Sequence, residues 1–261
     1  MAPEAPDYYF TRTGEHTFSP TINCEGAWTT EDYHFASLAG LIAHETERHH
    51  AREGMQLSRI SYDILGRLPL DDVTVTTKVL RPGKKIELVE TTATIQDRTA
   101  IIARTWYLAE HDSSSGMADE SPRYPAPEET DVVQFSHYWG GGFIRQLQCH
   151  TIGDEPPLEF AWLTSPNVIV AEDERNEVAE FISRVDVANG VSYRVSPEKW
   201  AFPNVDLTIH LYRRPQGAWT GLEARNHWGP AGAGVTSTVL HDVHGPLGRA
   251  EQMQSIQNLQ G

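Results

Sequence analysis

The same succession of sequence patterns occurs twice in this chain, before and after a segment rich in Ser, Pro and acidic residues. In each half, a stretch with apolar residues three and four positions apart is followed by four stretches in which Val, Ile, Leu and Thr often alternate with polar residues. The first pattern predicts a helix, and the others predict antiparallel strands. A duplicated unit constrains the fold strongly, because the two copies are expected to share one architecture.

Two helices and eight strands follow from these patterns. The predicted helices are residues 30–50 and 174–188. Glu31 and Asp32 lie in the expected first turn of the first helix, where acidic side chains favour a helix start. The predicted strands are residues 56–66, 73–81, 85–96 and 100–109 in the first half, and 206–213, 219–228, 234–242 and 248–256 in the second.

A few residue identities support the duplication. Arg67 and Pro69 recur as Arg213 and Pro215, 146 positions later, although the shared order of elements is the stronger evidence. Apolar periodicity disappears in residues 111–131, so this segment is predicted to be an exposed linker.

The order of elements in each half is an early strand, a long helix and four further strands. This order is typical of a hotdog fold, in which an antiparallel sheet wraps a central helix. A single unit of this kind exposes a long sheet edge, so two units in one chain are expected to pair. We therefore predict an α+β double hotdog with two antiparallel sheets, joined at their edges, each around a central helix. Residues 1–110 form the N-terminal hotdog, 111–131 the linker and 132–261 the C-terminal hotdog.

Charge and composition exclude several classes of protein. With 21 Lys and Arg against 36 Asp and Glu, the net charge of −15 opposes binding to nucleic acid or to anionic membranes. The first residues lack the basic and apolar pattern of an export signal, and no window of 18 residues is uniformly apolar. Cys24 and Cys149 are too few for a disulfide framework or a zinc cluster. We expect reduced, core-filling thiols in a cytoplasmic protein.

Two motifs suggest chemistry that their spacing does not support. His44 and His49 are separated as HExxxH, which places them roughly 140° apart around a helix, so we interpret this segment as a solvated, charged helix end rather than a metal site. Residues 140–142 are three glycines without the context of a phosphate-binding loop, and they are interpreted as a turn.

The end of the second predicted helix carries polar residues at its core side. Asn189 falls on the apolar face that contains Ile182 and Val185, and Asp186 lies at the border of that face. A buried carboxylate and amide need partners. The alternative is that Asn189 and Gly190 form a helix C-cap and that Asp186 is exposed. Periodicity leaves both open.

Four segments resemble a known family, the thioesterase-like double-hotdog proteins related to acyl-CoA thioesterase II that are common in actinobacteria. These segments are residues 18–28, 186–192, 203–219 and 221–252. In that family an Asp on the second-half helix, a Thr or Ser at the start of the next strand and a Gln on the last strand orient the hydrolytic water. The resemblance places these roles on Asp186, Asn204 and Gln252.

This sequence departs from the family pattern at two places. Asn204 stands where a hydroxyl residue is usual, and its hydrogen-bond geometry differs. His34-Phe35-Ala36 stands where relatives commonly have His-Gly-Gly, so Phe35 and Ala36 are expected to narrow the approach to the helix start. The substrate is expected to contact His34, Phe35, Ala36 and Asn189.

We expect hydrolysis of an acyl thioester, in particular acyl-CoA, without metal or cofactor. Asp186 is the expected general base, acting on a water held by Asn204 and Gln252, and direct attack by Asp186 to form an anhydride stays open. Backbone N–H groups near Phe35 and Ala36 are expected to receive the oxyanion. The alternatives are a non-catalytic acyl-binding protein and an enoyl-CoA hydratase, whose motif has His where this chain has Val191. A homo-oligomer of double-hotdog protomers is compatible with the sequence.

Overall fold

Fourteen strands form one sheet in the computed structural model, which describes residues 5–153 and 157–260. The strands of the first half are β1 Tyr8–Arg12, β2 Thr17–Pro20, β3 Met55–Ile64, β4 Val73–Arg81, β5 Ile86–Ile95 and β6 Arg98–Ala109. Those of the second half are β7 Asp131–Val133, β8 Gln148–Thr151, β9 Phe160–Thr164, β10 Val168–Val170, β12 Asp206–Leu211, β13 Thr220–Trp228, β14 Ala233–Asp242 and β15 Gly245–Ser255. A separate small sheet pairs β11 Trp200–Ala201 with β16 Gln257–Asn258.

The described residues form fewer helices than strands, and only α1 is long. The α-helices are α1 Phe35–His50, α2 Gly142–Arg145, α3 Glu177–Val185 and α4 Ala188–Val191. The 3-10 helices are η1 Ile22–Cys24, η2 Ser114–Gly116, η3 Pro127–Glu129 and η4 Phe135–His137. No helix in the described ranges combines the length and the apolar character needed to cross a membrane.

The eight predicted strands are confirmed, with ends within three residues of the expected ones. The predicted start of the first helix is wrong, because α1 begins at Phe35 and His34 is its N-cap. Glu31 and Asp32 therefore precede the helix, in an extended segment where Asp32 pairs with Pro69. The second predicted helix is divided into α3 and α4, and Asn176 caps the start of α3 through its side chain.

The two halves share a single sheet rather than two. Strand β3 pairs with β12, so that Asp63 faces Asp206 and Arg59 faces His210, and this pairing makes the sheet continuous. The sheet is also not entirely antiparallel, because β1 of the first half pairs in parallel with β10 of the second. Backbone hydrogen bonds therefore join the two halves at two places, between β3 and β12 and between β1 and β10.

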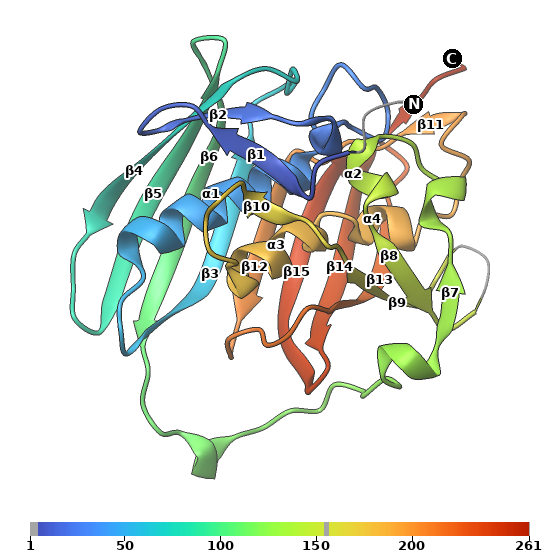
Figure 1. Cartoon of the computed structure of the whole chain (residues 1–261). Coiled ribbons are helices and arrows are strands. Elements are labelled where there is room, and N and C mark those ends of the chain that lie inside the picture. The colour runs from blue at the N-terminus through green and yellow to red at the C-terminus, as the bar shows by residue number, and fades with distance from the viewer. Residues whose placement is uncertain (1–4, 154–156, 261) are drawn as a thin grey trace.

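Helices α1 and α3 lie side by side on one face of the sheet (Figure 1). Their apolar sides are buried, as periodicity predicts, and include Leu38 and Ile42 of α1 and Phe181 and Ile182 of α3. The helices lie close together at Gly40, where an added Cβ would lie 2.7 Å from Cβ of Ser183. Small residues at this crossing let the two helix backbones come near each other.

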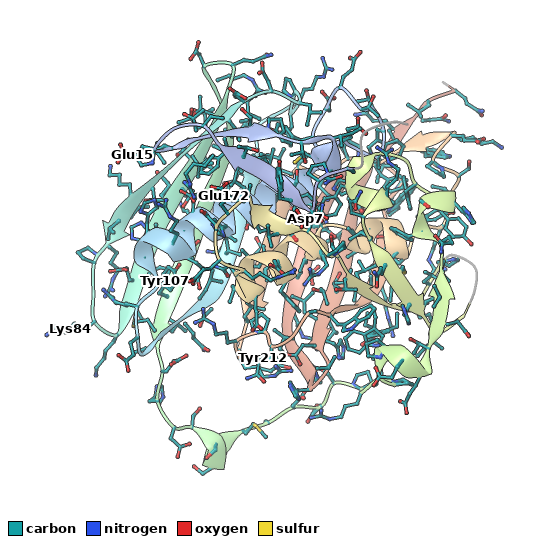
Figure 2. The ribbon with its side chains drawn as sticks, viewed as in Figure 1. Asp7, Glu15, Lys84, Tyr107, Glu172 and Tyr212 are labelled. Carbon is teal, nitrogen blue, oxygen red and sulfur yellow. The ribbon has the colours of Figure 1, made fainter. Side chains whose placement is uncertain are left out.

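The segment between β6 and β7 contains only η2 and η3, and it passes below the sheet in Figure 1. Its second part packs on the second half: Arg123 donates a hydrogen bond to the carbonyl of His244, and Tyr124 stacks on Phe160. The predicted domain limits remain predictions. Elsewhere, charged side chains project outward, as Lys84 does at the turn after β4 (Figure 2).

Replacing Gly40 with Val is expected to lower the free energy of unfolding by about 1–3 kcal/mol, because the added atoms would overlap Ser183 and Ile169. Denaturant titration measures this change. Gly116→Val is the control, since nothing lies within 4 Å of a Cβ added at Gly116, and its effect should stay within about 0.5 kcal/mol. Equal stability of the two variants would show that the helix crossing is not tightly packed.

Candidate active site

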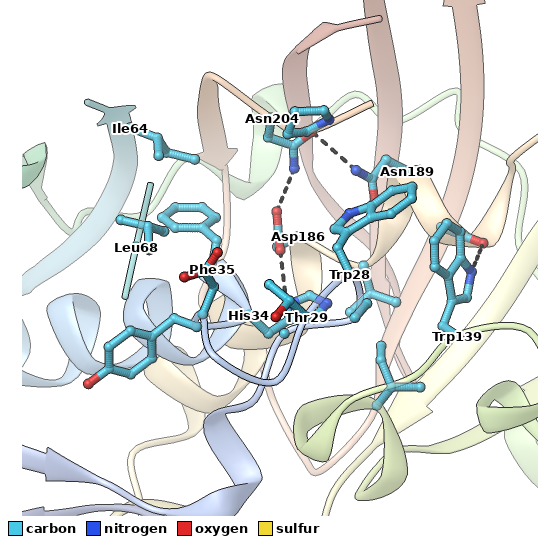
Figure 3. A pocket seen from close by; sticks show the side chains of 18 of the residues that line it. Trp28, Thr29, His34, Phe35, Ile64, Leu68, Trp139, Asp186, Asn189 and Asn204 are labelled. Carbon is cyan, nitrogen blue, oxygen red and sulfur yellow. Dashed lines mark hydrogen bonds and ion pairs between the residues drawn. The ribbon is translucent and has the colours of Figure 1, made fainter. Parts of the chain in front are cut away.

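The start of α1 meets the end of α3, and this is where the polar residues predicted for the site gather (Figure 3). His34 caps α1, because its Nδ1 accepts a hydrogen bond from the N–H of Ala36 at 3.3 Å. Asp186 follows the last turn of α3, and its Oδ2 lies 3.3 Å from the same Nδ1. A carboxylate thus faces the positive end of a helix dipole from the other half.

Asp186 is only 4% exposed, so the alternative in which it points into solvent is wrong. Its Oδ1 accepts hydrogen bonds from Nδ2 of Asn204 at 2.6 Å and from Nε2 of Gln252 at 3.2 Å. The same Nε2 also donates to the backbone carbonyl of Asp186 at 3.0 Å. The structure therefore brings together the three residues that the family resemblance selected, and it adds His34 on the other carboxylate oxygen.

A second amide fixes the orientation of Asn204. Nδ2 of Asn189 donates to Oδ1 of Asn204 at 3.2 Å, so the Asn204 side chain accepts on one side and donates to Asp186 on the other. Asn189 is held in turn, because Nδ2 of Asn226 donates to its carbonyl at 3.2 Å. Sequence analysis missed Asn226. Its signal was a polar residue on the face of β13 where Leu222 and Ala224 are buried.

A cavity of about 210 Å³ lies against Asp186 and is lined by both halves. Phe35 lines it, and its ring packs edge to face on Tyr62 with centroids 5.4 Å apart. The side chain of Ala36 is completely buried and is not part of the lining. The expected narrowing therefore concerns Phe35, while Ala36 contributes its backbone N–H to the cap.

One backbone donor remains at the start of α1. The N–H of Ser37 donates to the carbonyl of His34, and that of Ala36 to the His34 ring. No hydrogen bond from the N–H of Phe35 is found within residues 5–153 and 157–260. This unpaired N–H, at the start of a 16-residue helix, is a favourable place for a developing negative charge.

Neither cysteine belongs to this cavity. Cys24 and Cys149 are buried free thiols, and burial raises the pKa of each to about 12. A thiol in this state carries almost no thiolate at neutral pH and is a poor nucleophile. Neither thiol is therefore suited to act as a nucleophile.

The predicted solvated end of the first helix is partly wrong, because His44 and Glu45 are 5% and 1% exposed. Strand β1 and the turn before α3 cover them. Nε2 of His44 lies 2.9 Å from Asp173, and Arg12 lies 2.8 Å from Glu45 and 2.7 Å from Asp173. Burial opposes ionisation of Asp173, but the bonds from His44 and Arg12 outweigh it and lower the pKa of that carboxyl.

Ligand atoms of His44, Glu45 and Asp173 lie within 4.8 Å of one another, a spacing that would also suit a metal ion. The guanidinium of Arg12 already bonds both carboxylates, so the cluster has its own cation. We interpret it as an ion-pair network that ties β1 and α1 to the second half.

Comparisons with known proteins point to one family. A family model described as the acyl-CoA thioesterase C-terminal domain matches residues 118–255, and one described as the acyl-CoA thioesterase N-terminal domain matches residues 25–108. No curated protein matches the sequence.

Solved structures with low sequence identity share the fold. A protein of unknown function with a hotdog fold from Alicyclobacillus acidocaldarius has a TM-score of 0.73 at 12% identity, covering 95% of both chains. Acyl-CoA thioesterase II TesB2 from Mycobacterium marinum has a TM-score of 0.67 at 10% identity, over 97% of this chain and 96% of that one. The tesB protein of Mycobacterium avium subsp. paratuberculosis has a TM-score of 0.68 at 14% identity, over 95% and 96%. The shared fold is a hotdog fold.

Removal of divalent metal by EDTA is expected to leave the melting temperature unchanged, because Arg12 balances the buried carboxylate of Glu45 and the partly buried one of Asp173. Arg12→Met is the comparison, and it should melt at a lower temperature because Glu45 and Asp173 each lose their closest ion-pair partner. A native protein that loses several degrees in EDTA and regains them with zinc would contradict the ion-pair interpretation.

Proposed function

The chain belongs to the acyl-CoA thioesterase family, and from this premise we propose that it hydrolyses an acyl thioester in the cavity beside Asp186. The observation that carries the proposal is a buried carboxylate, held by two amides, at the start of a long helix. A carboxylate in this position can activate a water, and the helix start can stabilise the charge that forms on the thioester oxygen.

Asp186 acts as the general base. Its Oδ1 is occupied by Asn204 and Gln252, which leaves Oδ2 as the oxygen that takes a proton from water. The water oxygen then bonds to the thioester carbon, and the carbonyl electron pair moves onto its oxygen. When the intermediate collapses, the C–S bond breaks, the sulfur takes a proton, and the acid and the free thiol leave.

The N–H of Phe35 and the positive end of α1 face the negative oxygen of this intermediate. This assignment rests on the contact between the α1 cap and Asp186, which brings the helix start to the reacting carbon. Donors fixed by the backbone need no rearrangement as the charge forms. Asp186 and the helix start therefore act on opposite ends of the same reaction, one on the water and one on the carbonyl.

His34 gives the proton a second location. Its Nδ1 lies 3.3 Å from both the N–H of Ala36 and Oδ2 of Asp186. Nδ1 carries no hydrogen when it accepts from Ala36, and once Oδ2 holds the proton of water, this O–H can donate to the same lone pair in place of the Ala36 N–H. His34 thus stabilises the protonated carboxyl until the leaving sulfur receives that proton.

We further propose that the two halves are two hotdog units, with the limits given by the repeat. The shared order of a helix and four strands supports this, as does the pairing of β3 with β12, which joins equivalent edges of the two halves. In this arrangement the site needs both units, because His34 comes from one and Asp186 from the other.

Asp186→Asn is expected to keep the fold and to lower kcat by about 10²-fold or more, because an amide cannot accept the proton of water. Thiol release from a panel of acyl-CoA thioesters measures the effect. Asp63→Asn is the matched control, since Asp63 is exposed on β3, and its kcat should equal that of the native protein. If native protein binds acyl-CoA without turnover, it is a binding protein, and equal turnover of Asp186→Asn would remove Asp186 from the mechanism.

Asn204→Leu is expected to lower kcat by about tenfold or more, because Oδ1 of Asp186 loses its shortest hydrogen bond and Asn189 loses its acceptor. Asn204→Thr keeps a donor at this position and should lose less activity. Steady-state kinetics with one acyl-CoA compare the two variants. Similar kinetics of Asn204→Leu and native protein would show that this amide does not orient the base.

A further inference from the structure

The cavity has two chemically different ends on either side of Asp186. Ile64, Leu68 and Phe35 lie on one side in Figure 3, and Trp28 and Trp139 lie on the other. Asp32 and Arg67, which form an ion pair, also line the cavity, and Arg67 directly precedes Leu68 in the chain. The second side, which we name the aromatic end, is formed by Trp28, Phe135, Trp139 and Phe202.

Three rings of the aromatic end contact one another edge to face. The centroids of Trp28 and Trp139 are 5.4 Å apart at 75°, and those of Trp28 and Phe202 are 5.3 Å apart at 87°. Trp139 and Phe202 are 5.7 Å apart at 85°. Each ring thus presents an edge or a face toward its neighbours, which is the arrangement that aromatic groups prefer.

The rings are held in place before any ligand binds. Nε1 of Trp139 donates to the carbonyl of Gly190 at 3.1 Å, and a Cβ added to Gly190 would lie 3.1 Å from this nitrogen. Gly141 has a φ of 86°, and a Cβ there would lie 2.2 Å from the carbonyl oxygen of Gly26. This close backbone contact holds the loop that carries Trp28 against the segment that carries Trp139.

Exposure and polarity indicate which end receives the acyl group. Phe202 and Phe135 are almost completely buried, whereas Trp28 is 47% exposed and lies at the opening. The pantetheine arm and phosphates of CoA are polar, so they fit a cluster of buried rings less well than the exposed edge at Arg67, which also pairs with Glu31 and Asp32. The acyl group is therefore expected at the aromatic end.

We propose that the acyl group of the substrate is itself a single aromatic ring, as in an aryl or arylacetyl thioester. A flat ring can make edge-to-face contacts with Trp139 and Phe202, and these add to the effect of burial. A flexible alkyl chain gains only buried area and loses rotational freedom when it is confined. The volume of about 210 Å³ is also below the roughly 300–1,000 Å³ of pockets for drug-sized ligands, which favours a compact group. This inference rests on the thioesterase function proposed above.

The test compares kcat/KM for benzoyl-CoA and phenylacetyl-CoA with that for hexanoyl-CoA and octanoyl-CoA. The native protein should prefer the better aryl thioester by about tenfold or more, the effect of one to two favourable ring contacts. In Trp139→Leu this ratio should fall to near one. Trp28→Leu also removes a ring of the aromatic end, one that contacts Trp139. Because Trp28 is half exposed, this substitution is expected to disturb the fold less than Trp139→Leu. Trp219→Leu is the control, because Trp219 contacts His150 away from the cavity, and its ratio should match that of native protein.

The outcomes separate the two proposals. Hydrolysis of alkyl thioesters as fast as aryl ones, with a ratio unchanged in Trp28→Leu, would overturn the aromatic preference and leave the thioesterase function intact. Absence of turnover for every thioester would overturn the proposed function. In that case, titration calorimetry with the thioether analogues of phenylacetyl-CoA and hexanoyl-CoA still decides the preference, and equal affinities would overturn it.

Discussion

A buried carboxylate that needs partners from two places is the constraint on which this structure depends. An unpaired charge at the position of Asp186 would cost several kcal/mol, so the fold must supply donors around it. Asn204 and Gln252 come from the second half, and the cap of α1 comes from the first. The site therefore exists only where the two halves meet, and neither half contains it alone.

The junction is correspondingly rigid. Pairing of β3 with β12 makes one sheet of the two halves, and pairing of β1 with β10 places a strand of the first half beside one of the second. The narrow helix crossing at Gly40 sets the spacing between α1 and α3. Arg12 adds a charged contact by binding Glu45 of α1 and Asp173 of the second half. These contacts fix the distance between a helix start and a carboxylate, on which the proposed chemistry relies.

Sequence patterns predicted the long strands because alternation is a local property, whereas the junction depends on distant pairing. The eight strands were found from alternation, but the parallel contact of β1 with β10 joins residues about 160 positions apart and leaves no local signal. The start of α1 was misplaced because His34 is not one of the usual capping residues, and the acidic pair before it resembles a first turn. The spacing of His44 and Glu45 predicts a solvated helix end because periodicity gives angles around a helix and not what packs there, and both side chains are buried. Periodicity places Asp186 at the border of the apolar helix face, whereas only the family resemblance selects Asn204 and Gln252, and neither selects Asn226.

The two departures from the family pattern both line the cavity beside Asp186. Asn204 reaches Asp186 directly at 2.6 Å and also accepts from Asn189, so its amide occupies one carboxylate oxygen and leaves the other for water. Phe35 places a ring against Tyr62, where glycine would leave space. Phe35 fills space beside Ile64 and Leu68, and the rings around Trp139 are held in place on the other side of Asp186. Because Phe35 narrows one end of the cavity, a bulky acyl group is expected at the other end. The departures are therefore consistent with an altered acyl preference rather than with loss of thioester hydrolysis.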